Sequence, residues 1–143
     1  MSQAPTKDEA IARLESYQER LEAALKEGRA AYDRLFDEAP PEVGLHEIDL
    51  AKNVTRVNAR ELEILGYRKD QVVGQHCSKF VVMHEASDRA ATKKLSGEGL
   101  KPFVRAFLRA DGSSVTMALV ERYLYDAKGV IVGIRTALMP IEI

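Results

Sequence analysis

The 143-residue sequence has one cysteine, no tryptophan and no long hydrophobic run. Cys77 cannot form an internal disulfide, and a single thiolate excludes zinc sites that need several. No apolar run approaches the roughly 20 residues that span a bilayer, and the start MSQAPTKDEA lacks the apolar core of a signal peptide. We therefore expect a cytoplasmic location, with no membrane contact in this region, although a cut from a longer, membrane-anchored chain has the same features.

An excess of charge of either sign is also missing. The 21 basic residues face 22 acidic ones, and no basic patch stands out, so we expect no nucleic-acid partner. Hydrophobic residues make up 45% of the sequence, which is enough for the core of one domain of ordinary size and an accessory element.

Motifs for catalysis and metal binding are absent from the sequence. The three histidines and one cysteine form no metal-ligand spacing, and neither a Gly-x-Ser-x-Gly motif nor a phosphate loop occurs. The acidic residues Glu47 and Asp49 alternate on a predicted strand, a pattern typical of a solvated face. We expect no catalytic residue and no metal.

The first 38 residues share one pattern, which ends at Pro40-Pro41. Thr6 and Glu9 have capping-box spacing, and apolar residues then recur at alternating steps of three and four. The pattern predicts one helix over about residues 7–38, separate from a domain over residues 39–143. The predicted dimer seam along this helix consists of Ile11, Leu14, Gln18, Leu21, Leu25, Tyr32, Leu35 and Phe36.

Two interpretations of this helix remain open. The seven-residue frame favours a homodimer, in which the helix forms a coiled coil with a second copy in parallel or antiparallel orientation. Tyr17 and several alanines widen the stripe, which favours packing on the chain's own domain. Both interpretations are compatible if Tyr32, Leu35 and Phe36 pack on the outer face of a sheet while the rest of the stripe contacts a second copy.

Shorter elements follow the prolines. Asn58 and Glu61 have a second capping-box spacing, and Gly66 ends the helix after them. Strands are predicted over residues 43–50, 53–58, 102–110, 114–125 and 130–141. Helices or helical turns are predicted over residues 58–66, 69–73, 78–82 and 85–95. This order predicts an α+β fold: a five-stranded antiparallel sheet with helices on one face.

Short motifs mark the boundaries of these elements in a characteristic order. They are the run FDEAPPEVGLHEID, Asn58, Leu65-Gly66-Tyr67, Gly74 with Phe80, Asp111-Gly112, and Gly129 with Gly133. In this order, the segment from Leu35 to about Ile141 resembles the PAS family. Such residues shape caps and turns, so they indicate the fold and leave the ligand open.

The resemblance implies a signal-sensing and dimerising module, with a small apolar ligand as one candidate. Such a module would be the input part of a bacterial sensor histidine kinase of a two-component system, or of a diguanylate cyclase. The output domain would be separate or lie C-terminal to this chain, which is itself not expected to be an enzyme. One alternative is a ligand-free protein–protein interaction module. Another is a flavin-binding photoreceptor of the light-oxygen-voltage (LOV) type.

The LOV alternative rests on Cys77, three residues after Gly74, where LOV members carry the cysteine that bonds to flavin. His76 replaces their asparagine, Ser78-Lys79 replaces an arginine–phenylalanine pair, and the last strand lacks the glutamine that contacts the flavin ring. A flavin edge would then be desolvated without partners. We therefore expect a buried structural cysteine and no flavin.

Haem is not expected either. Haem-binding members of the family place their ligand farther into the helix after His84, where this sequence has Ala90 and Ala91. His46 falls within the first strand, and we interpret it as a residue of the sheet. The sequence has no Cys-x-x-Cys-His motif for covalent haem attachment.

A pocket between the helices and the sheet is the main candidate for a ligand site. Arg105 and Arg109 share one face of a strand and suit surface ion pairs or, alternatively, anion binding. The apolar candidates, which otherwise simply fill the core, are Cys77, Phe80, Met83, Phe103, Phe107, Met117 and Leu119.

Overall fold

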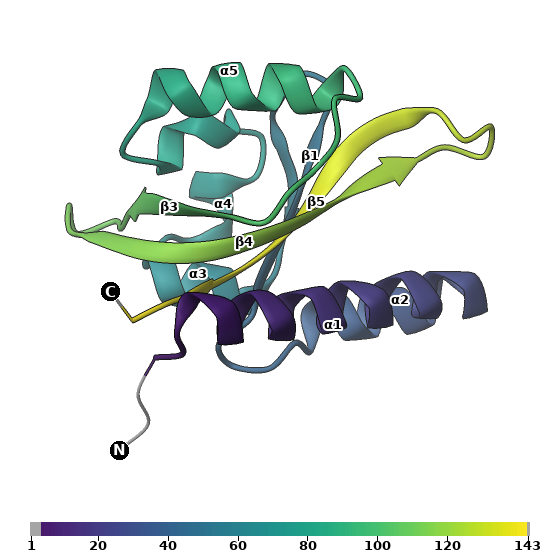
Figure 1. Cartoon of the computed structure of the whole chain (residues 1–143), viewed down its shortest axis with the longest axis horizontal. Helices are drawn as coiled ribbons and strands as arrows, with labels where there is room; N and C mark the ends of the chain where they lie inside the picture. Colours follow the sequence, from purple (N-terminus) through teal and green to yellow (C-terminus); the bar gives the residue numbers. More distant parts are fainter. Residues whose placement is uncertain (1–3, 143) are drawn as a thin grey trace.

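The computed structural model describes residues 4–142 and contains one antiparallel sheet with helices on both faces (Figure 1). The strand order is β2-β1-β5-β4-β3. The strands are β1 (Gly44–Asp49), β2 (Val54–Val57), β3 (Phe103–Leu108), β4 (Ser114–Tyr125) and β5 (Ile131–Pro140). The helices are α1 (Lys7–Glu27), α2 (Arg29–Asp37), α3 (Ala59–Leu65), α4 (Lys69–Val72), the 3-10 helix η1 (Cys77–Phe80) and α5 (His84–Leu95). The predicted α+β fold with five antiparallel strands is confirmed.

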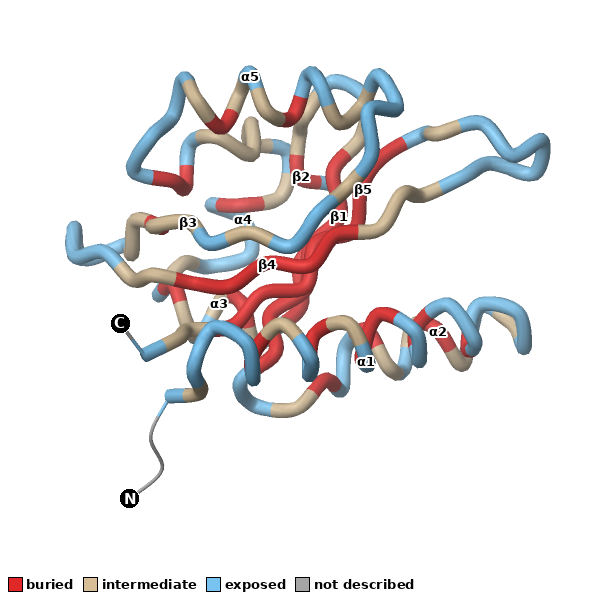
Figure 2. The backbone as a smooth tube through the Cα atoms, viewed as in Figure 1, coloured by how far each residue is buried: buried red, intermediate tan, exposed pale blue. Residues whose placement is uncertain are grey.

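Helices α3, α4 and α5 cover one face of the sheet, which we call the inner face. Ile134 and Leu138 of β5 and Met117 and Leu119 of β4 are among the residues buried there. Successive side chains of a strand point to opposite faces, so the residues between them point outward. Helices α1 and α2 lie on this outer face, and buried residues follow the strands that run between the two helical layers (Figure 2).

The helix α3 begins and ends where the sequence predicts. The Asn58 side chain accepts a hydrogen bond from the backbone N–H of Glu61, and Gly66 takes the left-handed conformation with φ 81°. Only half of the predicted capping box forms. The Glu61 carboxylate does not turn back to the backbone of Asn58, because it contacts the ring of His46 at 2.7 Å. The Thr6–Glu9 capping box forms completely.

The prediction of one continuous helix over residues 7–38 is wrong. The backbone breaks at Gly28, where φ is 153° and ψ is 163°, values that L-residues rarely adopt and that glycine tolerates. Helix α2 folds back along α1, and the Tyr17 hydroxyl donates a 2.5 Å hydrogen bond to the carbonyl of Leu35. The N-terminal segment is therefore a helical hairpin.

This hairpin packs on the chain's own sheet. Its apolar residues share one buried cluster with outward-facing residues such as Leu45, Val120 and Ala137. The expected contact of Tyr32, Leu35 and Phe36 with the outer face is confirmed. Of the predicted dimer seam, Leu14, Gln18, Leu21, Tyr32 and Phe36 are buried within the chain; Ile11 and Leu35 are partly buried and Leu25 is exposed.

Candidate ligand-binding site

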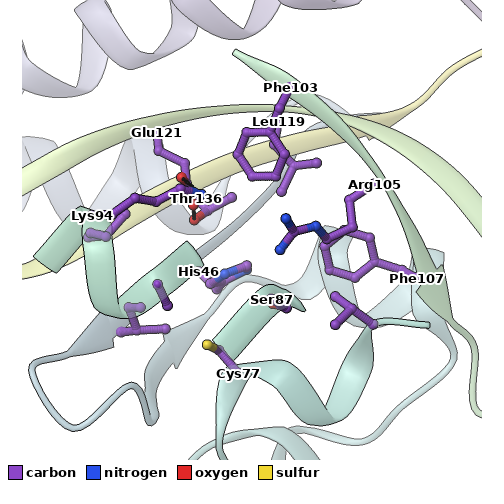
Figure 3. A pocket seen from close by; sticks show the side chains of 14 residues that line it. His46, Cys77, Ser87, Lys94, Phe103, Arg105, Phe107, Leu119, Glu121 and Thr136 are labelled. Atoms are coloured by element: carbon purple, nitrogen blue, oxygen red, sulfur yellow. Dashed lines mark hydrogen bonds and ion pairs between the residues drawn. The ribbon is translucent and has the colours of Figure 1, made fainter. Parts of the chain in front are cut away.

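A small cavity lies between α5, η1 and the inner face of the sheet (Figure 3). Its volume is about 50 Å³, several times the roughly 10–15 Å³ that a cavity needs to hold one water molecule. The walls mix apolar and polar side chains: His46, Ile48, Cys77, Val81, Ser87, Ala91, Lys94, Phe103, Arg105, Phe107, Leu119, Glu121, Ile134 and Thr136.

Strand register builds the polar floor of this cavity. His46 of β1 pairs with Thr136 of β5, and Thr136 pairs in turn with Glu121 of β4. The three side chains therefore lie in one row across the inner face. Next to them, on the opposite face, the same register aligns Glu47 of β1 with Arg135 of β5, and Arg135 with Arg122 of β4. Two rows of polar residues thus lie back to back in one sheet.

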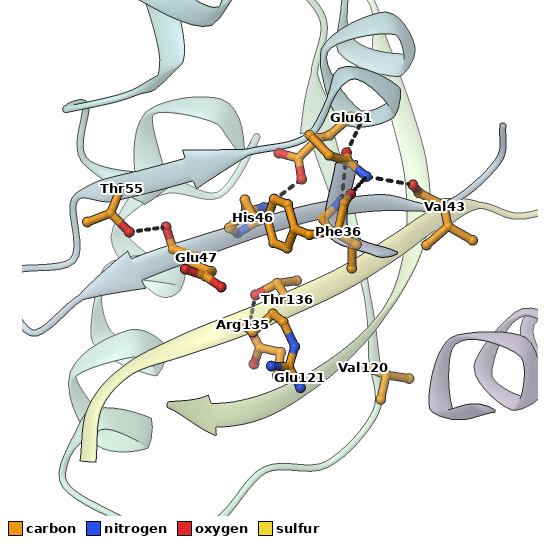
Figure 4. A network of polar contacts seen from close by, with 12 residues as sticks. Phe36, Val43, His46, Glu47, Thr55, Glu61, Val120, Glu121, Arg135 and Thr136 are labelled. Carbon is orange, nitrogen blue, oxygen red and sulfur yellow. Dashed lines mark hydrogen bonds and ion pairs between the residues drawn. The ribbon is translucent and has the colours of Figure 1, made fainter. Parts of the chain in front are cut away.

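His46 has a charged partner beneath the cavity. Its Nδ1 lies 2.7 Å from the carboxylate of Glu61 (Figure 4), and both side chains are buried. Burial alone opposes the imidazolium form. The carboxylate of Glu61, with weaker contributions from Glu121 and Glu47, outweighs that effect and raises the pKa of His46 above its ordinary value.

Glu121 is held from two sides. Its Oε2 accepts a 2.8 Å hydrogen bond from the Thr136 hydroxyl, and its Oε1 accepts a 2.7 Å bond from Nζ of Lys94. The Lys94 ammonium also lies 3.9 Å from the ring centroid of Phe103. Because Lys94 belongs to α5, this contact ties the last turn of that helix to the sheet.

Arg105 differs from the other charged groups of the cavity. Its side chain extends from β3 into the cavity toward His46 (Figure 3), and its guanidinium lies 4.9 Å from the ring centroid of Phe103. Within residues 4–142 this guanidinium has no ion-pair partner. Arg109, its neighbour in the sequence prediction, contacts backbone and hydroxyl oxygens near Ile64, Ser113 and Ser114 and lies outside the cavity.

Four of the seven predicted pocket residues line the cavity: Cys77, Phe103, Phe107 and Leu119. Phe80 and Met117 are buried in the core beside it, in agreement with the alternative that these residues simply fill the core. Met83 is 65% exposed. Among the polar residues of the wall, the sequence suggests anion binding for Arg105, as an alternative to a surface ion pair, and no ligand role for Lys94, Glu121 or Thr136. The strand pattern places Arg105 and Glu121 on the face that lines the cavity, because Arg105 lies on the same face as Phe103 and Phe107. Glu121 likewise lies on the same face as Met117 and Leu119.

A second polar network lies on the outer face, under the helical hairpin. Gln18 of α1 donates hydrogen bonds to the carbonyls of Val120 and Arg135, at 2.8 and 3.2 Å, and its Oε1 accepts from Nε of Arg135. Tyr32 of α2 bonds to both Arg135 and Glu47. Glu47 is therefore buried, and its predicted place on a solvated face is wrong because α2 covers it.

Comparison with solved structures gives the fold a name, whereas no family model and no curated protein matches the sequence. A PAS domain of an HTR-like protein from Haloarcula marismortui matches with a TM-score of 0.66 at 23% identity, over 86% of this chain and 99% of that one. A domain of a sensory box sensor histidine kinase/response regulator from Geobacter sulfurreducens matches with a TM-score of 0.65 at 19% identity, over 77% and 91%.

A third similar structure contains a small molecule. It is the PAS domain, in complex with ethanol, of a LuxR-family transcriptional regulator from Burkholderia thailandensis, with a TM-score of 0.57 at 17% identity over 74% of this chain and 94% of that one. LOV domains match at 17 to 18% identity. The chain has the PAS fold.

The PAS inner cavity of this chain does not fit a flavin. A volume of about 50 Å³ is far below the 300 Å³ or more of ordinary cofactor and ligand pockets. The inner face of β5 presents Ile134, Thr136 and Leu138, none of which carries an amide that could read the ring. Burial raises the pKa of Cys77 to about 11, which disfavours the reactive thiolate.

The remaining sites expected from the PAS resemblance can also be placed. His84 is exposed, with Nδ1 2.7 Å from the carbonyl of Ser78 at the start of α5, and it does not line the cavity. In the part of the chain that the structure describes, no group of three or more His, Cys, Asp or Glu side chains is arranged to hold a metal ion. None of the helices between residues 4 and 142 is long and apolar enough to cross a membrane.

Proposed function

We propose that this chain is a sensory PAS module whose inner cavity binds a small anion of a few non-hydrogen atoms, such as a short carboxylate. The observation that carries the proposal is Arg105, whose guanidinium enters the cavity without an ion-pair partner among the described residues. A guanidinium recognises a carboxylate through two parallel hydrogen bonds. This proposal adopts the anion-binding alternative for Arg105 in place of the small apolar ligand that the resemblance offers as one candidate.

The charges around the cavity favour an anion. Arg105 and Lys94 are cationic, and the raised pKa of His46 favours its imidazolium form. Glu121 is the acidic group of the wall, and its two oxygens are already bonded to Lys94 and Thr136. An anion near Arg105 would therefore meet positive charge without having to displace an existing carboxylate.

The size of the cavity limits the ligand. With about 50 Å³ available, an extended apolar molecule does not fit without movement of α5 or η1. The similar PAS domain in complex with ethanol shows that this fold can hold a molecule of two carbon atoms, which supports a ligand of comparable size here.

Strand β5 offers a route from the cavity to the helical hairpin. Thr136 bonds to Glu121 on the inner face, and the adjacent Arg135 bonds to Gln18 and Tyr32 on the outer face. A ligand that shifts Glu121 or Thr136 would also move the backbone that carries Arg135. In a sensor kinase or a cyclic-dinucleotide enzyme, such a movement could reach the output through the hairpin, in a homodimer of the module.

Native mass spectrometry of the purified protein, followed by calorimetric titration with formate, acetate and propionate, tests the proposal. We expect saturable binding of at least one of them, and a loss of about tenfold or more in Arg105→Gln, because hydrogen bonds to charged groups contribute about 1.5–3 kcal/mol. Arg109→Gln is the matched control, since Arg109 lies outside the cavity. Absence of binding by all three anions would favour the ligand-free interaction module instead.

A further inference from the structure

A groove separates the Gly28 end of the helical hairpin from the β4–β5 turn, which lies at the same end of the molecule (Figure 1). Its volume is about 790 Å³, many times that of the inner cavity. Apolar side chains on both sides of the groove are exposed to solvent: Leu25 on α1 is 44% exposed and Val132 on β5 is 38% exposed. Four cationic residues also line it: Lys26, Arg29, Arg122 and Arg135.

Arg135 lies at the floor of this groove and is only 1% exposed. Its Nε donates to Gln18 at 2.6 Å and its Nη1 to the Tyr32 hydroxyl at 3.3 Å. Its Nη2 is buried without a hydrogen-bond partner in the described part of the chain. An unpaired buried donor is costly, and more so when it is charged, so the floor of the groove lacks one acceptor.

Glu22 shows where such an acceptor would sit. Its Oε1 lies 3.2 Å from Nε of Arg122 and 3.8 Å from Nη2 of Arg135, and the second distance is too long for a hydrogen bond. The Glu22 side chain is 50% exposed, so it can swing outward at little cost. A carboxylate already stands between the two guanidinium groups, yet it leaves the deeper one unsatisfied.

The other acidic residues of the groove are engaged elsewhere. Glu47 bonds to the Tyr32 hydroxyl, and Glu121 bonds to Lys94 and Thr136 on the inner face of the sheet. Without Glu22, the guanidinium groups of Arg122 and Arg135 would therefore have no carboxylate of the lining between them. A ligand carboxylate fits that position.

We propose that this groove binds an amphiphilic organic carboxylate. The ligand carboxylate displaces that of Glu22 and accepts hydrogen bonds from Arg122 and from Nη2 of Arg135, and its hydrocarbon part lies along Leu25 and Val132. The lining of this groove shares only Glu121 with that of the inner cavity, and the proposal does not rest on the function proposed for that cavity. Displacing Glu22 also removes its ion pair with Arg122, which joins α1 to the sheet. Ligand binding therefore weakens one contact that holds the helical hairpin on the sheet.

Calorimetric titration with octanoate tests the site, with octanol and inorganic phosphate as matched probes. Octanoate carries both the charge and the chain, and each of the other probes carries only one of them. We expect saturable binding of octanoate at least about tenfold tighter than either, because the lost contacts are charge-assisted hydrogen bonds or buried CH₂ groups. Equal binding of octanol or of phosphate would overturn the assignment, as would the absence of binding by octanoate.

Variants locate the bound probe. Arg122→Gln should weaken octanoate binding about tenfold, and Glu22→Gln should strengthen it, since the internal competitor loses its charge. Glu19→Gln, an exposed change on the same helix, should leave it unchanged. Arg105→Gln should also have no effect, which separates this site from the inner cavity. Octanoate affinity that is unchanged in both Arg122→Gln and Glu22→Gln, or amide NMR shifts at Ser87 and Ala91 instead of Leu25 and Val132, would contradict the proposal.

Discussion

Gln18 of α1 and Arg135 of β5 are 117 residues apart in the sequence, and a 2.6 Å hydrogen bond joins Oε1 of the glutamine to Nε of the arginine. Both side chains are buried. In the seven-residue repeat, Gln18 occupies a core position at which a polar residue often sets the register of a coiled coil. In the folded chain the same residue instead fixes the position of α1 on the sheet, because its amide also bonds to two strand carbonyls.

Replacing Gln18 with alanine should destabilise the whole domain. The change leaves Nε of Arg135 and two carbonyls without their partner in a buried place, so we expect a loss of about 2–3 kcal/mol in the free energy of unfolding. Urea unfolding followed by circular dichroism measures it. Glu19→Ala, on the exposed side of the same turn, should change the free energy by less than about 0.5 kcal/mol. Equal stability of both variants would show that the network does not hold the hairpin.

Phe36→Ala tests whether the hairpin is part of the domain or only tethered to it. The Phe36 side chain is fully buried in the outer cluster, and the Arg56 guanidinium lies 4.1 Å from its ring centroid. Removing a buried phenylalanine ring costs about 3–5 kcal/mol, and we expect a single, lowered thermal transition. Leu50→Ala, at a position 56% exposed, is the control. A melting curve of Phe36→Ala identical to that of the wild type would mean that the hairpin contributes nothing to the domain.

Local signals predicted most of the elements, and long-range ones decided the rest. The cap at Asn58 and the left-handed Gly66 act within one turn, so the sequence predicts helix α3 correctly. Gly28 is also a local signal, but whether the helix breaks there depends on the sheet. The apolar residues of α1 and α2 can both pack on the outer face only when the chain folds back at Gly28. For Arg105 the sequence leaves anion binding as an alternative to a surface ion pair, because alternation places its side chain on a face. Only register and packing show a cavity in which it has no partner.

The pair of His46 and Glu61 predicts a pH dependence of stability. Because the pKa of His46 is raised in the folded state, this contribution is complete below the ordinary pKa of about 6.5 and is lost as the pH rises through the folded value. We expect thermal stability to fall over that window in the wild type, and this fall to disappear in His46→Gln. NMR titration of the His46 ring gives the pKa directly. A midpoint below 6.5 would contradict the prediction.

Cys77 should react slowly with thiol reagents. Burial raises its pKa to about 11, so at pH 8 roughly 0.1% of it is thiolate, against a fifth or more for an ordinary cysteine with a pKa near 8.5. Alkylation by iodoacetamide, followed by mass spectrometry, should be about a hundredfold slower in the folded protein than in the same protein unfolded in urea. Similar rates in both states would show that the thiol is accessible and activated.

The choice between a helical hairpin and a continuous helix depends on Gly28. Its positive φ is unfavourable for any residue with a Cβ, although a Cβ placed there would meet no atom within 4 Å. Gly28→Ala should therefore shift the chain toward one helix over residues 7–37, without creating a steric clash. A straight helix cannot keep both Leu21 and Phe36 on its own sheet, and its apolar stripe then becomes available to a second copy.

We expect light scattering to show stronger dimerisation of Gly28→Ala, by at least about tenfold in the dissociation constant, and Leu25→Asp to weaken it, because Leu25 is the exposed residue of the predicted seam. Gly99→Ala is the matched control: φ is also positive there, at 99°, with open space around a Cβ, but the residue lies far from the hairpin in the sequence. If Gly28→Ala and Gly99→Ala associate equally, the stripe serves only the chain's own sheet. A dimer would then have to form through another surface, because the five buried seam residues would remain inaccessible to a partner.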